Sequence, residues 1–199
     1  MLSCAVALVL LLDISASVSD ADWVKQRDGT AEAFVHPVIQ ATVANMEGGM
    51  AVKAIAFGAK TRTLIPWRVV RSPRDLYFFA KDLSETKQNA EIATEIGYAL
   101  DTATKAFDIA PCDPAHKVID ISTDGVASKV PTEEARDRAV EAGIVVNAIG
   151  VGPHEGTETF LRESVISPTG FAIMAESWDA FALAIRRKIT WEIASARKP

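Results

Sequence analysis

The stretch LVLLLDISASVSD, residues 8–20, sets an apolar run directly against a carboxylate and a series of hydroxyls. The apolar residues end at Asp13, and Ser15 and Ser17 follow at alternate positions. One interpretation is the hydrophobic part of a signal peptide, cleaved after the small residues that end at Ser17. The other is a buried strand that delivers one carboxylate and two hydroxyls to a metal ion. The rest of the sequence decides between them.

Composition predicts one globular domain spanning residues 1–199, long enough to bury a hydrophobic core. The formal net charge of -5 disfavours a nucleic-acid-binding protein, which normally needs a basic face. Basic residues do gather at 186–188, but Ile185 and Ile189 flank them. We therefore predict that Arg186, Arg187 and Lys188 lie on the solvated side of an amphipathic helix.

The apolar runs are too short to predict a membrane span, which needs roughly 18 to 20 residues. The first twelve residues also lack the basic segment that begins a signal peptide. We therefore expect any export signal to lie upstream of this sequence.

Apolar runs alternate with helix-like segments along the whole chain. Strands are predicted at 5–12, 50–58, 62–70, 116–123, 144–152 and 170–174. Helices are predicted at 21–45 with a break near 36–37, and at 72–87, 94–107, 131–142, 157–165 and 178–196. This order predicts an α/β fold: a doubly wound, mostly parallel six-stranded sheet with helices on both faces. Pro66 marks 62–70 as an antiparallel edge strand.

Polar residues stand where such a sheet places its working surface, at the carboxyl ends of the strands. Asp13, Ser15 and Ser17 follow the first strand, Thr94 begins a helix, and Asp124 ends the strand VIDIST. Carboxylate and hydroxyl oxygens favour Mg²⁺, with Mn²⁺ or Ca²⁺ as alternatives, over Zn²⁺. Each element also has a plainer interpretation. Asp13 and its serines could cap the next helix, Thr94 could be an ordinary N-cap, and Asp124-Gly125 could form a turn.

Together these residues resemble the metal-ion-dependent adhesion site of von Willebrand factor type A (vWA) domains. The resemblance rests on DISAS, the threonine of TEIG and the aspartate of TDG, and it covers essentially the whole chain. It implies that Ser15, Ser17 and Thr94 supply hydroxyls to the metal. Asp13 and Asp124 would act directly or through water. In that family, a carboxylate from a partner protein usually completes the coordination.

The segment 160–189 and the IPW strand resemble a bacterial branch of this family that has no known function and often carries an export signal. Two departures from the family pattern remove no metal ligand: Ala16 replaces a common glycine, and Ile92-Ala93 stand where small glycines often precede the threonine.

Cys4 and Cys112 are the two cysteines, and from the residues alone they are either buried free thiols or one disulfide. The family topology makes their strands parallel neighbours and places both cysteines at the end of the sheet opposite the metal. A disulfide there would imply an oxidising compartment, most simply a bacterial periplasm. The alternative location for the protein is the cytoplasm.

The resemblance implies a cation-dependent protein-binding domain whose partner presents an acidic residue, and not an enzyme. The alternative is a Mg²⁺-dependent hydrolase of a phosphate ester or similar substrate, for which His154 and Glu155 could contact a ligand or serve as a base. Cleavage after Ser17 would discard Asp13 and both serines. We therefore interpret residues 8–20 as a central strand followed by the first half of a metal site.

Overall fold

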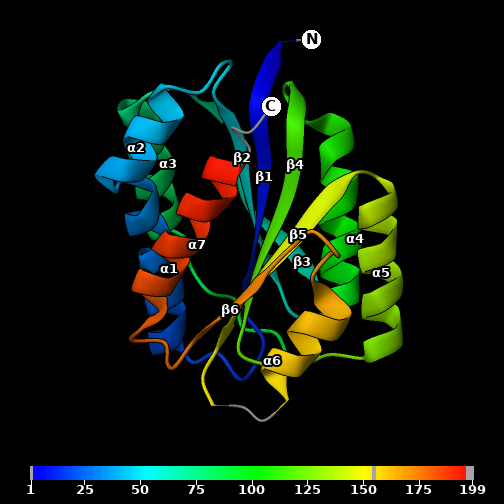
Figure 1. Ribbon diagram of the computed structural model, residues 1–199. Helices are drawn as coiled ribbons and strands as arrows, with labels where there is room; N and C mark the ends of the chain where they lie inside the picture. The colour runs from blue at the N-terminus through cyan, green and yellow to red at the C-terminus, as the bar shows by residue number, and fades with distance from the viewer. Residues whose placement is uncertain (1, 154–155, 196–199) are drawn as a thin grey trace.

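One six-stranded sheet with helices on both faces makes up the computed structural model, which describes residues 2–153 and 156–195 (Figure 1). The strands are β1 (Ser3–Asp13), β2 (Met50–Phe57), β3 (Thr61–Val70), β4 (Asp113–Thr123), β5 (Ile144–Val151) and β6 (Ala172–Ala175). They lie in the order β3-β2-β1-β4-β5-β6, and the β2–β3 pair is antiparallel whereas the other four pairs are parallel. The predicted fold class is confirmed, including the edge strand that contains Pro66.

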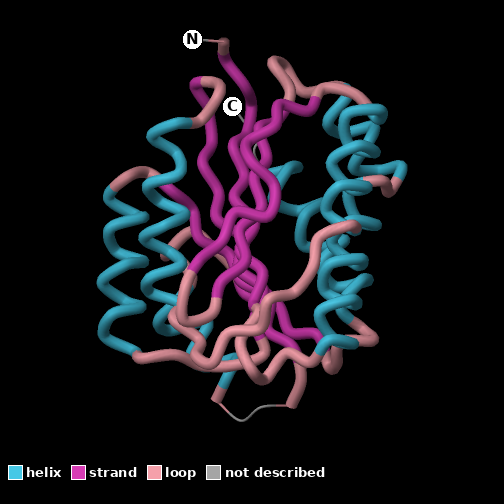
Figure 2. Tube along the Cα trace, turned by 180° about the vertical axis from the view of Figure 1, so that it is seen from behind, coloured by secondary structure: helices cyan, strands magenta, loops and turns pink. Residues whose placement is uncertain are grey.

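Two layers of helices cover the sheet. The helices are α1 (Asp20–Phe34), α2 (Pro37–Ala44), α3 (Pro73–Ser84), α4 (Ile96–Ala106), α5 (Lys129–Glu141), α6 (Thr157–Phe160) and α7 (Phe181–Ser195). Helices α1, α2, α3 and α7 lie on one face and α4, α5 and α6 on the other (Figure 1). The view from behind shows the strands running between these layers (Figure 2).

The central strand β1 is apolar along its length because it packs against helices on both sides. Side chains alternate between the faces of a strand. Val6, Leu8, Leu10 and Leu12 therefore join the core under α1, α3 and α7. Ala7, Val9 and Leu11 join the second core, under α4 and α5. Burying each leucine side chain stabilises the fold by roughly 1.5–3 kcal/mol.

A disulfide joins the beginnings of the two central strands. Cys4 and Cys112 are bonded with a Cα–Cα distance of 5.8 Å, and both are buried. Cys4 pairs in register with Pro114, whereas Asp13 is the last residue of β1 and Asp124 directly follows the last residue of β4. The covalent link and the candidate metal residues are thus at opposite ends of the sheet.

Helix α7 is attached to the sheet through buried charges. Lys188 Nζ lies 2.5 Å from Asp120 Oδ1 on β4 and 2.6 Å from Glu192 Oε1. Asn147 on β5 donates a hydrogen bond of 2.8 Å to the same glutamate oxygen. Burial, followed by the charge of Asp120, raises the pKa of Glu192 to about 8, against the opposing effect of Lys188.

The prediction that residues 186–188 all face solvent is wrong for Lys188. Its side chain is fully buried, whereas Arg187 is exposed. Position 188 lies three residues after Ile185 and four before Glu192, so it shares the buried face of α7.

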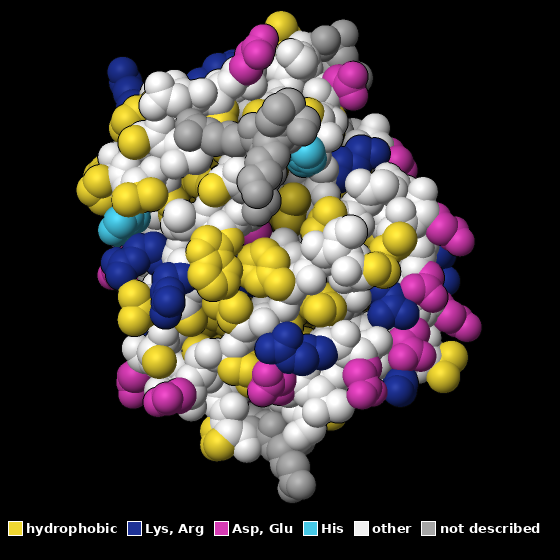
Figure 3. All heavy atoms as spheres, viewed as in Figure 1, with side chains coloured by type: hydrophobic (Ala, Val, Ile, Leu, Met, Phe, Trp, Pro, Cys, Tyr) yellow, Lys and Arg dark blue, Asp and Glu magenta, His cyan; other side chains and the backbone are white. Residues whose placement is uncertain are grey.

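On the face of the molecule drawn in Figure 3, Lys and Arg side chains are interspersed with Asp and Glu.

The described helices include none that is both long enough and apolar enough to cross a bilayer.

Candidate metal site

Asp13 is the buried centre of the candidate site, at the last position of β1. Its Oδ1 accepts a hydrogen bond of 2.7 Å from the main-chain N–H of Ser15, and its Oδ2 accepts one of 2.5 Å from the Thr123 hydroxyl. The Gln26 side chain accepts from the main-chain N–H of Asp13 at 3.1 Å and donates to its carbonyl at 2.8 Å. Helix α1 and strand β4 therefore hold this carboxylate in place.

The hydroxyls after β1 connect Asp13 to the end of β4. Ser15 Oγ and Ser17 Oγ are 3.0 Å apart, and Ser17 Oγ donates to Asp124 Oδ1 at 2.6 Å. Ser15 and Asp124 are buried, whereas Ser17 is exposed. Four of the five predicted metal residues therefore meet at one place, and one of them faces solvent.

Thr94 comes from the loop between α3 and α4, which lies against the ends of β1 and β2. Glu91 donates its main-chain N–H to Ile14 at 2.8 Å, and Glu95 donates to Gly58 at 3.1 Å. A Cβ on Gly58 would lie only 2.3 Å from the Cβ of Glu91, so a glycine is needed for this approach. Thr94 Oγ1 is 4.0 Å from the position that a Cβ on Gly125 would take. Thr94 thus adjoins the turn that contains Asp124.

Helix capping does not explain these residues. Helix α4 begins at Ile96 with Glu95 as its N-cap, so Thr94 is not the cap that the plainer interpretation predicted. Helix α1 is capped by Ser19, whose side chain accepts from the main-chain N–H of Asp22. Asp124 and Gly125 do lie in a bend after β4, and Gly125 donates to the Thr123 hydroxyl at 3.2 Å.

The charges at the site suit a cation. Burial raises the pKa of Asp13 to about 6, and hydrogen bonds from Ser15 and Thr123 oppose this rise. Among the described residues, neither Asp13 nor Asp124 forms an ion pair with a basic side chain. Buried carboxylates without a counter-charge need a proton or a metal ion.

The chemistry of the oxygen donors narrows the choice of metal. The described chain holds no group of three or more His, Cys, Asp or Glu side chains that could bind a metal by themselves. The predicted set contains two carboxylates and three hydroxyls, and such a set would fit a hard cation such as Mg²⁺ better than Zn²⁺.

A groove of about 340 Å³ borders the site on the α7 side. Ser17 and Asp124 form part of its wall. Its other polar and aromatic lining residues include Asp22, Lys25, Glu176, Trp178 and Asp179.

The described histidines are not at this end of the sheet. His36 caps α2, its ring accepting from the main-chain N–H of Val38, and His116 pairs with Val6 near the beginning of β4. His154 and Glu155, the candidate ligand contacts or base, lie outside the described residues. A general base for hydrolysis is therefore not placed beside the carboxylates by the described histidines.

Two contacts of Asp13 were missed by the sequence interpretation. Thr123 immediately precedes Asp124, and its place at the end of a predicted strand could have indicated a role. Gln26 lies in the middle of α1 and carries no local signal.

A family model described as "Protein of unknown function (DUF1194)" matches residues 3–197. No curated protein matches the chain.

Solved structures similar to this chain are vWA domains. The BatB protein of Bacteroides thetaiotaomicron is 22% identical with a TM-score of 0.69, over 96% of this chain and 99% of that one. The vWF domain of the type V pilus tip protein Mfa5 from Porphyromonas gingivalis is 11% identical with a TM-score of 0.70, over 98% and 96%. Proximal thread matrix protein 1 of the mussel byssus, in a structure with a zinc-occupied MIDAS motif, is 16% identical with a TM-score of 0.68. That match covers 94% of this chain but 46% of the mussel chain.

Proposed function

Because this chain belongs to the DUF1194 family and has the vWA fold, we propose that it is a divalent-cation-dependent protein-binding domain. Asp13, Ser15, Ser17, Thr94 and Asp124 would hold the cation, and residues 1–199 would act as one domain. The partner would contribute an acidic side chain.

The single observation that carries this proposal is the convergence of Asp13, Ser15, Ser17 and Asp124 in one hydrogen-bonded chain. Ser17 is exposed at its outer end, so a partner can reach the site from solvent. A hard divalent cation, when bound, would supply a positive charge that attracts a carboxylate. The hydroxyls and Asp124 would hold the cation close to the surface.

Protein binding is favoured over catalysis by the shape and chemistry of this surface. A hydrolase that uses Mg²⁺ needs a positioned base as well as the metal. The described histidines lie elsewhere, and the exposed side of the site is shared with an open groove. The pilus tip and byssal matrix proteins of similar fold support the same choice.

We also propose an extracytoplasmic location, most simply the periplasm. The disulfide between Cys4 and Cys112 supports this, because such bonds persist in oxidising compartments. The similarity to a pilus tip domain agrees with it.

Affinity capture with the folded domain tests the function. The parent protein and an Asp124→Asn variant are immobilised and exposed to a periplasmic extract in Mg²⁺ or in chelator. We expect a partner that the parent retains in Mg²⁺, that chelator releases and that the variant does not retain. Equal retention by parent and variant in Mg²⁺ would contradict the proposal.

A further inference from the structure

Three exposed hydrophobic side chains lie in α4 or in the loops that precede α4 and α5, close in sequence to the predicted metal residues. Ile92 is 92% exposed, Tyr98 is 55% exposed and Val126 is 51% exposed. Ile92 precedes Thr94 by two positions and Val126 follows Asp124 by two, and Thr94 Oγ1 lies 4.0 Å from the position that a Cβ on Gly125 would take, so their loops are adjacent. When a partner covers hydrophobic side chains that are otherwise exposed to water, the free energy of the complex is lowered.

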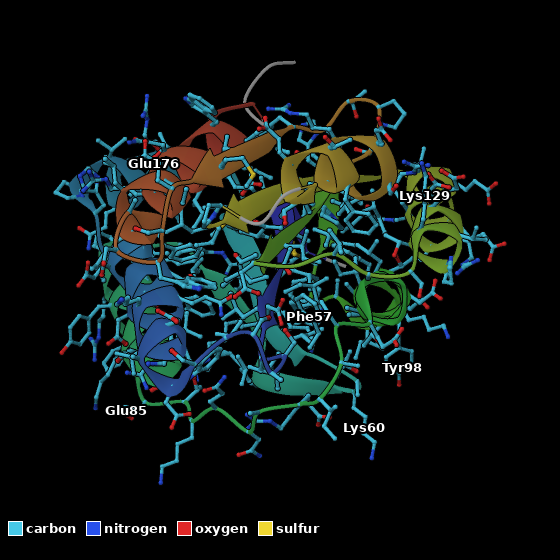
Figure 4. The ribbon with its side chains drawn as sticks, turned by 90° about the horizontal axis from the view of Figure 1, so that it is seen from below. Phe57, Lys60, Glu85, Tyr98, Lys129 and Glu176 are labelled. Atoms are coloured by element: carbon cyan, nitrogen blue, oxygen red, sulfur yellow. A yellow bond between two sulfur atoms is a disulfide. The ribbon has the colours of Figure 1, made fainter. Side chains whose placement is uncertain are left out.

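The groove on the other side of the site is acidic. Lys25 is the one basic residue in its described lining, and its Nζ already lies 3.4 Å from Asp22 Oδ1 and 2.9 Å from Asp179 Oδ1. Glu176 is exposed and has no basic partner among the described residues. Viewed from below, Glu176 and Tyr98 lie on opposite sides of this end of the molecule, with Phe57 at the end of β2 between them (Figure 4).

We propose that this surface recognises an extended polypeptide segment with three features in order: a Lys or Arg, an acidic residue and an apolar residue. The inference rests on the proposed function, because the acidic residue is the one that meets the cation. The apolar residue covers Ile92 and Val126. The basic residue enters the groove, pairs with Glu176 and lies against Trp178.

Charge complementarity supports this occupant. The groove presents Asp22, Glu176 and Asp179 against one lysine, so it favours a cationic side chain and repels a second carboxylate. A cation over the face of a tryptophan is further stabilised by the ring. An extended chain rises about 3.3 Å per residue, so it can reach both flanks of the site, whereas a small carboxylic acid cannot.

A peptide selection tests this inference. The probe is a synthetic library with a central Glu and three randomised positions on either side, exposed to the immobilised folded domain in Mg²⁺ and in chelator. Peptides retained only in Mg²⁺ are sequenced. We expect enrichment of Lys or Arg on one side of the Glu and of aliphatic or aromatic residues on the other.

Matched variants assign the two flanks. Ile92→Ser with Val126→Ser is expected to weaken an enriched peptide about tenfold or more, as measured by fluorescence polarisation, and to abolish the apolar preference alone. Glu176→Gln is expected to abolish the basic preference alone. The controls are Ile109→Ser, which changes a side chain that is 73% exposed after α4, and Glu47→Gln in the turn before β2. Both should leave the peptide affinity unchanged.

The outcomes separate this inference from the proposed function. Mg²⁺ titration of every variant by calorimetry should give the affinity of the parent. Mg²⁺-dependent retention of peptides whose flanking positions stay random, or retention of no peptide by a domain that binds Mg²⁺, would overturn the three-part recognition. A parent protein that binds no Mg²⁺ would overturn the proposed function itself.

Discussion

Ser17 Oγ donates a hydrogen bond of 2.6 Å to Asp124 Oδ1, although 107 positions separate the two residues in the chain. The contact joins the loop after β1 to the loop after β4, and it exists because these parallel strands are neighbours. Both loops leave the same end of the sheet, so a polar residue after each strand is brought to one place.

Replacing Gln26 by Leu should destabilise the domain. Its side chain makes two hydrogen bonds with the main chain of Asp13, and all these groups are buried. An unsatisfied buried polar group costs about 1–3 kcal/mol, so we expect the free energy of unfolding to fall by roughly 2 kcal/mol or more. Urea denaturation measures this, with Gln40→Leu on α2 as the control. Equal stability of the two variants would show that the Gln26 contacts contribute nothing.

Replacing Lys188 by Met should lower the free energy of unfolding more than Gln26→Leu does. The change leaves Asp120 and Glu192 buried without the cation between them. Removing one partner of a buried ion pair typically costs about 3–5 kcal/mol. Arg187→Met, at the exposed neighbouring position, should lie within about 0.5 kcal/mol of the parent. If denaturation gave Lys188→Met and Arg187→Met the same free energy of unfolding, the stabilising role of buried Lys188 would be refuted.

Glu192 should make stability depend on pH. Its pKa is raised from 4.5 to about 8, so the folded state keeps a proton that the unfolded state loses. This contribution to stability is complete below pH 4.5 and is lost as pH rises towards 8. Between pH 6.5 and 8, the free energy of unfolding of the parent should fall relative to that of Glu192→Gln, which keeps a neutral side chain. If the free energy of unfolding of the parent and of Glu192→Gln changed equally with pH, this prediction would be contradicted.

Removing the disulfide should lower stability without affecting the metal site. The bond closes a loop with a sequence separation of 108, and losing a native disulfide from a small domain typically costs about 2–5 kcal/mol. In Cys4→Ser with Cys112→Ser we expect a lower melting temperature and an unchanged Mg²⁺ affinity. Mass measurement after alkylation of the unreduced parent provides the check on the bond itself, since two alkylated cysteines would exclude it.

Much of the fold could be predicted because its signals are local. The continuous apolar run of β1 indicates a strand covered on both faces, and Pro66 indicates the edge. The break between α1 and α2 follows from Pro37, and Ser72 marks the beginning of α3.

Other features depend on long-range contacts that no local pattern reveals. Lys188 looks like a solvated lysine until β4 places Asp120 beneath it. Gln26 acquires its role only when α1 packs beside the end of β1. Thr94 lies two positions before α4 begins, because its loop is held by hydrogen bonds to Ile14 and Gly58. These roles arise from tertiary contacts, so helix propensity and hydrophobic periodicity could not predict them.

The most direct test of the metal site is calorimetric titration of the folded parent with Mg²⁺, beside Ser17→Ala and Asp124→Asn. Ser19→Ala is the matched control, because it removes a nearby hydroxyl that caps α1 and does not contact Asp124. We predict one Mg²⁺ per parent molecule, an affinity at least about tenfold weaker in Ser17→Ala and Asp124→Asn, and parental affinity in Ser19→Ala. Identical binding by all four proteins, or no binding by the parent, would contradict the assignment of this site.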